Sequence, residues 1–176
     1  MNAANKLTIL RLLMIPVFVA LVLHRQFNIA VWVFIAAAIT DALDGFVART
    51  FNMKTEFGTM IDPLADKLLI ISAFICLVFV NNIAPETLIP AYVPVVVIAR
   101  DVLLIFGVAI VYVLRGRIEI KPSFLGKFTT FFQMLSIIFI LLNFHYIKLL
   151  LNIMVIFTIS STIEYIFIGN SLLNEK

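Results

Sequence analysis

The sequence predicts an all-α, polytopic integral membrane protein with six transmembrane helices in a single domain over residues 1–176. Of the 176 residues, 63% are hydrophobic and 17 are Phe, so too few polar side chains remain to cover a water-soluble domain. Backbone groups in lipid must satisfy their own hydrogen bonds, which leaves only helices or a closed β-barrel. Barrel strands alternate apolar and polar residues, whereas the runs 29–40 and 68–80 are apolar on every side. Helices are therefore expected.

The first three helices are expected over residues 7–23, 29–50 and 62–80, because a membrane span needs about 20 residues. The first follows Lys6, and its apolar stretch continues past Arg11 without the pattern of a cleaved signal peptide. The third contains the only cysteine, Cys76, which we interpret as a buried thiol without a chemical role.

The last three helices are expected over residues 88–114, 126–144 and 147–169. Turn-forming residues in the segments 81–85, 115–122 and 143–145 mark the breaks around them.

Six spans place both termini on one side of the membrane. The loops on the opposite side carry only Arg25 and Lys148. Ten basic residues fall on the side of the termini: Lys6, Arg11, Arg49, Lys54, Lys67, Arg115, Arg117, Lys121, Lys127 and Lys176. By the positive-inside rule, both termini face the cytoplasm.

Four of the ten acidic residues fall in one short window, at helical spacings: Asp41, Asp44, Asp62 and Asp66. Residues three or four apart share one face of a helix. Charged groups in the membrane are costly and normally functional, and four clustered carboxylates need a cation to hold them. The window therefore predicts a metal site. For Asp62 alone, a helix N-cap before Pro63 is the alternative.

The ligand types favour a hard cation such as Mg²⁺, Mn²⁺ or Ca²⁺ over zinc. We expect Mg²⁺ or Mn²⁺, with a pair of ions flanking a phosphate group. His24 and His145 fall in the loops on the opposite face, so neither is expected to be a ligand. Arg49 follows Asp41 by about 12 Å of helix, which places the site just inside the cytoplasmic edge of the membrane. A guanidinium there is a natural partner for phosphate oxygens.

Small residues in the same window would leave room beside the acids for a base or a diphosphate: Gly45, Ala48 and Gly58. Close helix packing is the alternative interpretation of each of them. No nucleic-acid partner is expected, because the net charge of +3 fits a basic cytoplasmic face that contacts anionic lipid head groups.

The spacing from Asp41 to Asp66, with Gly45, Ala48, Arg49 and Gly58 between, resembles the signature of the CDP-alcohol phosphatidyltransferases. Three further segments resemble the phosphatidylglycerophosphate synthase and cardiolipin synthase branches: Asn5-x-Leu7-Thr8-x-x-Arg11, Ile98-Ala99-Arg100-Asp101 and Pro122-Ser123-Phe124-Leu125-Gly126-Lys127. The resemblance implies six transmembrane helices, a homodimer and a cytidine diphosphate lipid bound through metal. We expect a protein of the cytoplasmic membrane of a prokaryote, with its active site facing the cytoplasm.

The resemblance also implies roles for individual residues. Asp41, Asp44, Asp62 and Asp66 would hold the metals, and Asp66 would also act as general base. The CDP-diacylglycerol would be bound by a group of residues around them: Asn5, Thr8, Gly45, Ala48, Arg49 and Gly58. An acceptor hydroxyl would attack the β-phosphorus and release CMP.

The identity of the acceptor is inferred from the basic residues Arg100, Lys121 and Lys127. Their charges would suit a phosphate group on the acceptor, which favours glycerol 3-phosphate. Two alternatives remain open for this region. Arg100 and Asp101 could form a structural pair, and the segment beginning at Arg100 also resembles the cardiolipin synthases, whose acceptor is phosphatidylglycerol. A more remote alternative is an ion-coupled transporter, since intramembrane carboxylates also occur in that class.

Overall fold

The computed structural model describes the backbone of residues 3–50, 56–80, 89–115 and 123–174. Side chains are described for residues 9–40, 67–80, 89–111, 113–114 and 123–171. Six helices and no strand occur in these parts of the chain. The chain divides into two compact units, residues 1–89 with 137–145, and residues 90–136 with 146–176.

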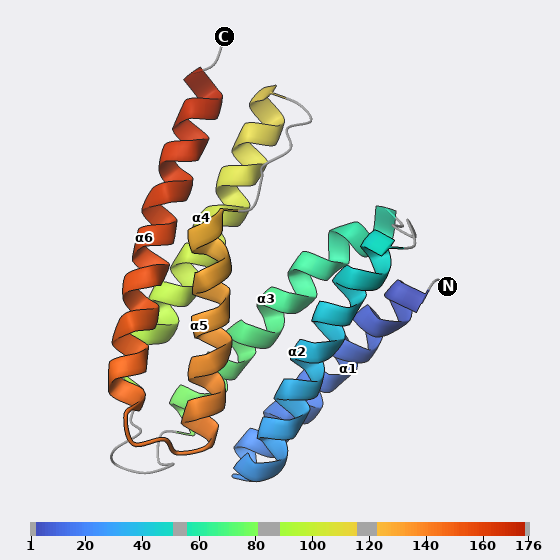
Figure 1. The fold of residues 1–176 in the computed structure, drawn as a ribbon, viewed down its shortest axis with the longest axis vertical. Helices are drawn as coiled ribbons and strands as arrows, with labels where there is room; N and C mark the ends of the chain where they lie inside the picture. The colour runs from blue at the N-terminus through green and yellow to red at the C-terminus, as the bar shows by residue number, and fades with distance from the viewer. Residues whose placement is uncertain (1–2, 51–55, 81–88, 116–122, 175–176) are drawn as a thin grey trace. The chain divides into compact units, whose positions relative to one another are not determined.

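The first unit contains α1 (Ala3–Leu23), α2 (Phe27–Thr50) and α3 (Glu56–Phe79). Helix α1 packs against each of the other two helices, and Figure 1 shows it beside α2. A tight turn joins α1 to α2, and Arg25 adopts a left-handed conformation there with φ of 59°. The rings of Phe18 and Phe34 meet across this hairpin at 5.6 Å between centroids. Both side chains are fully buried, and the core of this unit also includes buried side chains of α3 such as Ile70 and Phe74.

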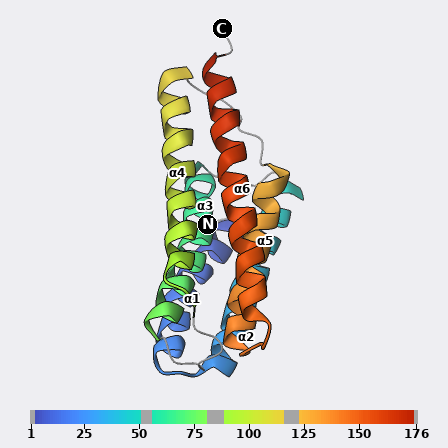
Figure 2. The ribbon, with the colours of Figure 1, turned by 90° about the vertical axis from the view of Figure 1, so that its left-hand side faces the viewer.

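The second unit is built on α4 (Tyr92–Arg115) and α6 (Ile147–Asn174), which run parallel and pack together (Figure 2). Tyr92 donates a hydrogen bond to Asn152 at 3.2 Å. Further along both helices, Arg100 donates to Ser161 at 3.3 Å. The same order on both helices establishes the parallel arrangement.

Helix α5 (Phe124–Leu141) runs antiparallel to α6. Its first residues approach Tyr165, whereas the Thr129 hydroxyl lies 3.0 Å from the carbonyl oxygen of Phe157. Phe132 stacks on Phe157 with 4.9 Å between ring centroids. Residues 137–145, which include the end of α5, belong to the first unit.

One face of α5 carries buried polar or small residues at intervals of three or four: Ser123, Gly126, Thr129, Gln133 and Ser136. Residues at this spacing share one face of a helix. Thr129 shares its hydroxyl proton between the carbonyl oxygens of Leu125 and Phe157. Among the residues that the structure describes, the side-chain amide of Gln133 has no hydrogen-bond partner. We call this set the polar stripe of α5.

Three helices contain segments long and apolar enough to cross a membrane: Tyr92–Val111, Phe124–Leu141 and Ile147–Ser171. Within the searched part of the chain, the first three helices contribute shorter apolar stretches, Ile9–Leu23, Phe27–Thr40 and Lys67–Phe79. Large apolar side chains also face outward, and Trp32 is 71% exposed and Phe79 80% exposed. Such surfaces suit a lipid environment.

The predicted all-α fold with six helices is confirmed, and most helix ends agree with expectation within a few residues. The third helix is the main exception, because it begins at Glu56 and not at Asp62. The N-cap alternative for Asp62 is therefore wrong, since Asp62 and Pro63 both lie inside the helix. Gly58, expected in the connecting segment, also lies within α3. The assignment of residues 1–176 to one domain stays a prediction.

Candidate active site

The four aspartates of the motif lie on two helices of the first unit, Asp41 and Asp44 on α2 and Asp62 and Asp66 on α3. At 1.5 Å of rise per residue, Asp44 lies about 9 Å along α2 from its end at Thr50. Asp62 lies about 9 Å along α3 from its start at Glu56. Asp41 and Asp66 each lie about 14–15 Å from the same ends. Counted along its own helix, each pair of acids thus lies within about 15 Å of the connecting segment, residues 51–55, and both helices pack against α1.

The side chains of residues 41–66 lie outside the described part of the chain, so the metal ligands stay a prediction. The same holds for the predicted lipid-binding side chains, although their backbones are helical: Asn5 and Thr8 on α1, Gly45, Ala48 and Arg49 on α2, and Gly58 on α3. Among the described side chains, no group of three or more His, Cys, Asp or Glu could hold a metal ion.

The burial of Arg11, on α1, was not predicted from the sequence. Its side chain is fully buried, with 0% exposure. Counted along the helices from the α1–α2 turn, Arg11 is about 18 Å away and Asp41 is about 21 Å away. A buried guanidinium is stable only near compensating acceptors. Arg11 is therefore a candidate counter-charge for the carboxylates of the motif.

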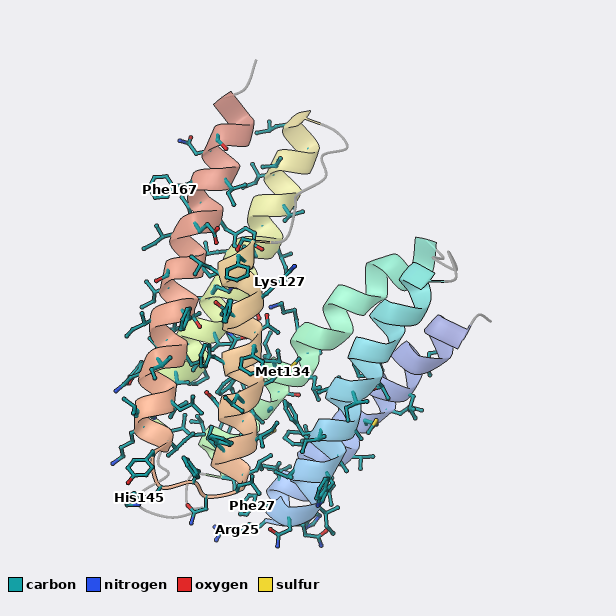
Figure 3. All side chains as sticks on the ribbon, viewed as in Figure 1. Arg25, Phe27, Lys127, Met134, His145 and Phe167 are labelled. Carbon is teal, nitrogen blue, oxygen red and sulfur yellow. The ribbon has the colours of Figure 1, made fainter. Side chains whose placement is uncertain are left out.

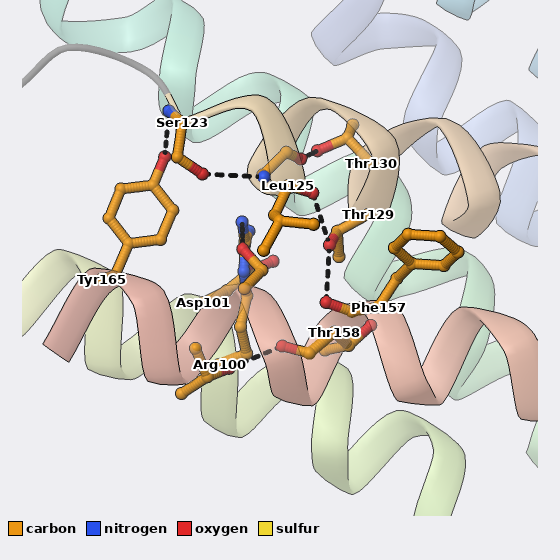
Figure 4. Close-up of polar contacts among 12 residues, drawn as sticks. Arg100, Asp101, Ser123, Leu125, Thr129, Thr130, Phe157, Thr158 and Tyr165 are labelled. Carbon is orange, nitrogen blue, oxygen red and sulfur yellow. Dashed lines mark hydrogen bonds and ion pairs between the residues drawn. The ribbon is translucent and has the colours of Figure 1, made fainter. Parts of the chain in front are cut away.

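Arg100 and Asp101 form a buried ion pair in the second unit, with 2.7 Å between Nη1 and Oδ1 (Figure 4). Their exposures are 4% and 1%. The second guanidinium nitrogen donates to Ser161 of α6 at 3.3 Å. The guanidinium carbon also lies 5.8 Å from the centre of the Tyr165 ring, within range of a cation–π interaction. The paired state left open by the sequence is thus present, and it fixes Arg100 against α6.

The start of α5 is held by Ser123 and Tyr165 (Figure 4). The hydroxyl of Ser123 accepts a hydrogen bond from the Gly126 amide at 2.9 Å, which caps the first turn. The carbonyl oxygen of Ser123 accepts one from the Lys127 amide at 3.3 Å. Its own amide donates to the Tyr165 hydroxyl at 3.2 Å. Tyr165 therefore touches both the buried Arg100 and the end of α5 that carries Lys127.

Lys127 has an exposed side chain near the start of α5 (Figure 3). Lys121, the third predicted acceptor residue, lies outside the described residues. Arg100 is buried, whereas Lys127 is exposed. Both cations could therefore bind the same phosphate group only if that group lay between their side chains. Neither cation lines the groove described next.

An apolar groove of about 290 Å³ lies between α4 and α6. Its walls include Leu104, Gly107, Val111, Tyr165 and Gly169. A Cβ atom added at Gly107 or Gly169 would meet nothing within 4 Å, so these glycines widen the groove instead of serving close packing. The groove suits hydrocarbon better than a charged substrate.

Comparison with known proteins decides the family. The sequence matches the CDP-alcohol phosphatidyltransferases over residues 1–163. The chain belongs to this family.

Three relatives show which branches of the family it is similar to. A CDP-diacylglycerol–glycerol-3-phosphate 3-phosphatidyltransferase of Bacillus subtilis is 32% identical, with 93% of each chain covered. A "probable phosphatidylglycerophosphate synthase" of Mycobacterium tuberculosis is 38% identical over 143 residues, covering 77% of this chain and 64% of the relative. A cardiolipin synthase (CMP-forming) of Rattus norvegicus is 40% identical over 125 residues, covering 70% of this chain and 38% of the relative.

Proposed function

We propose that the protein transfers a phosphatidyl group from CDP-diacylglycerol to glycerol 3-phosphate and releases CMP. The observation that carries the proposal is the aspartate motif on α2 and α3, inside a chain that belongs to the CDP-alcohol phosphatidyltransferases. The relative from Bacillus subtilis, which is matched over nearly its whole length, carries the name of this reaction. Phosphatidylglycerophosphate would be the product, which assigns the enzyme to phospholipid biosynthesis.

The donor set fits a divalent cation, because carboxylates at i, i+3 on α2 and at i, i+4 on α3 would present hard oxygen ligands on one face of each helix. Asp41, Asp44, Asp62 and Asp66 would hold one or two Mg²⁺ or Mn²⁺ ions. When bound, the metal neutralises the phosphate charge and so makes CMP a better leaving group.

The remaining chemistry falls to the protein's own residues. Asp66 would take the proton from the acceptor hydroxyl, because a hydroxyl is a poor nucleophile until a positioned base removes its proton. The oxygen then forms a bond to the β-phosphorus of CDP-diacylglycerol, and the bond from that phosphorus to the CMP oxygen breaks. Arg49 would hold the diphosphate, and Asn5, Thr8, Gly45, Ala48 and Gly58 would surround the nucleotide.

The acceptor phosphate would be bound by Arg100, Lys121 and Lys127. Arg100 is already oriented by Asp101 and Ser161, so it would lose little conformational freedom on binding a ligand. Charge-assisted hydrogen bonds from two or three such cations would give the site its preference for a phosphorylated alcohol.

Cardiolipin synthesis with phosphatidylglycerol as acceptor is the second candidate. Two observations favour it: the similarity to the cardiolipin synthase of Rattus norvegicus and the apolar groove beside Tyr165, which would suit a lipid acceptor.

The membrane arrangement belongs to the same proposal. All six helices would cross the cytoplasmic membrane of a prokaryote, both termini and the active site would face the cytoplasm, and two copies would form a homodimer. The excess of Lys and Arg on one side of the predicted spans supports this orientation.

A direct assay tests the proposal. The purified protein in detergent is given CDP-diacylglycerol and Mg²⁺, with glycerol 3-phosphate or phosphatidylglycerol in parallel, and CMP release is measured. Release that depends on glycerol 3-phosphate and stops when EDTA removes the metal is expected. Release with phosphatidylglycerol alone would support the second candidate, and no release with either acceptor would overturn both.

A further inference from the structure

We propose that Tyr165 is a positioning residue that holds the start of α5, and with it Lys127, in the orientation needed to bind the acceptor. The inference rests on the proposed function, since Lys127 is assigned to the acceptor there. Tyr165 lies on α6 in the second unit, whereas the aspartate motif lies on α2 and α3 of the first unit.

The first support is the hydrogen bond between the Ser123 amide and the Tyr165 hydroxyl, at 3.2 Å. Ser123 precedes the first residue of α5, and its amide would otherwise lack an intrahelical acceptor. Ser123 in turn receives hydrogen bonds from the amides of Gly126 and Lys127. One tyrosine hydroxyl thus fixes the residue on which the first turn of α5 depends.

The second support is the close fit at Gly126. A Cβ atom at this position would lie 2.9 Å from the Tyr165 hydroxyl oxygen and 3.2 Å from Cε2 of the same ring. These distances are shorter than ordinary contact, so any side chain at residue 126 would push Tyr165 and α5 apart. Glycine therefore allows the contact between the ring and the backbone of the first turn.

The third support is the link to Arg100. The face of the same ring lies 5.8 Å from the Arg100 guanidinium carbon, and Asp101 and Ser161 hold that guanidinium in place. The ring thereby has one contact with the buried cation on α4 and another with the start of α5. Removing the hydroxyl would release α5 while leaving the ring beside Arg100.

The test compares Tyr165→Phe with Tyr92→Phe. Both changes remove one hydroxyl from a contact involving α6, but the hydroxyl of Tyr92 donates to the exposed Asn152, away from the start of α5. Loss of a neutral hydrogen bond that orients Lys127 should raise the KM for glycerol 3-phosphate about three- to ten-fold. The KM for CDP-diacylglycerol should stay within about two-fold, and Tyr92→Phe should change neither value. Equal rises in both KM values, or no rise for the acceptor, would overturn the proposal.

A double variant examines the fit at Gly126. Gly126→Ala should raise the acceptor KM in the same way, and combining it with Tyr165→Phe should give less than the product of the two separate effects, because the hydroxyl no longer meets the new methyl group. A full multiplicative effect would contradict the shared contact.

Two further outcomes separate this proposal from the proposed function. If wild-type protein uses phosphatidylglycerol and not glycerol 3-phosphate, the proposed acceptor is wrong, and the Tyr165 comparison is made on the KM for phosphatidylglycerol. If no acceptor is used, hydrogen exchange in the first turn of α5 decides: Tyr165→Phe should speed exchange of the Ser123 amide at least about three-fold over Tyr92→Phe. Unchanged exchange would overturn the positioning role.

Discussion

Asp101→Asn would leave the Arg100 guanidinium buried without its anion, and the structure sets the size of the effect. The pair has a 2.7 Å contact and is 4% and 1% exposed, so water cannot replace the missing carboxylate. Losing one partner of a buried ion pair costs about 3–5 kcal/mol of folding free energy. Ser161 and the Tyr165 ring remain beside Arg100, which favours the lower end. The expected fall in Tm is then about 6–12 °C.

The companion variant removes both charges, as Arg100→Met with Asp101→Leu. Apolar replacement of a whole buried pair is often neutral or stabilising, so the double variant should unfold close to the wild-type Tm. Its use of glycerol 3-phosphate should nevertheless be lost, because the guanidinium would be gone. Thermal unfolding in detergent and acceptor-dependent CMP release give the two readouts, and Ser161→Ala, which removes only a 3.3 Å hydrogen bond, is the control for mild damage.

Two results would refute this reasoning. A double variant as unstable as Asp101→Asn would mean that the charges themselves stabilise this region. A stable double variant with a normal KM for glycerol 3-phosphate would mean that Arg100 is purely structural and does not bind the acceptor.

Four more outcomes are expected. Changing any one of the four motif aspartates to Asn should abolish CMP release without preventing membrane insertion, and near-normal turnover in two of the four variants would show the metal assignment to be wrong. With Mg²⁺ present, Asp66→Asn should still bind CDP-diacylglycerol, whereas Asp41→Asn should lose most binding; equal losses would leave the base unassigned. Lys127→Ala should raise the acceptor KM about ten-fold or more and leave the KM for CDP-diacylglycerol unchanged; a change in the nucleotide-lipid KM alone would place Lys127 on the other substrate. Arg11→Met should lower the Tm mainly without Mg²⁺, because a metal would supply the charge that Arg11 provides; equal losses with and without Mg²⁺ would contradict its role as counter-charge.

The helices could be predicted well from the sequence because continuous apolar runs leave no other way to satisfy the backbone in lipid. Their ends were harder to place. The Asp62-Pro63 pair has the chemistry of a helix start, yet α3 begins at Glu56. Local preference for a cap is worth about 1 kcal/mol, which the continuation of a packed helix can outweigh.

The helix that carries each motif aspartate was predictable from the sequence, whereas contacts between residues far apart in the chain were not. The acid positions follow from intervals of three and four residues. The partnership of Ser123 with Tyr165 joins residues 42 positions apart, and no local pattern signals it. The sequence left the pairing of Arg100 with Asp101 open, because adjacent helical side chains do not normally face each other, and the structure decided it.

The polar stripe of α5 has a consequence for how the protein enters the bilayer. Thr129, Gln133 and Ser136 are each 0% exposed in the folded chain, but an isolated α5 would present all three to lipid. Its mean hydropathy of 1.7 is also below the 2.4 of the α4 span and the 1.8 of the α6 span. Helix α5 is thus the least favourable of these three to partition alone. During biosynthesis α5 should remain beside the translocon until a following helix covers its polar stripe, and α6, which contacts the stripe at Thr129, is the next helix to emerge.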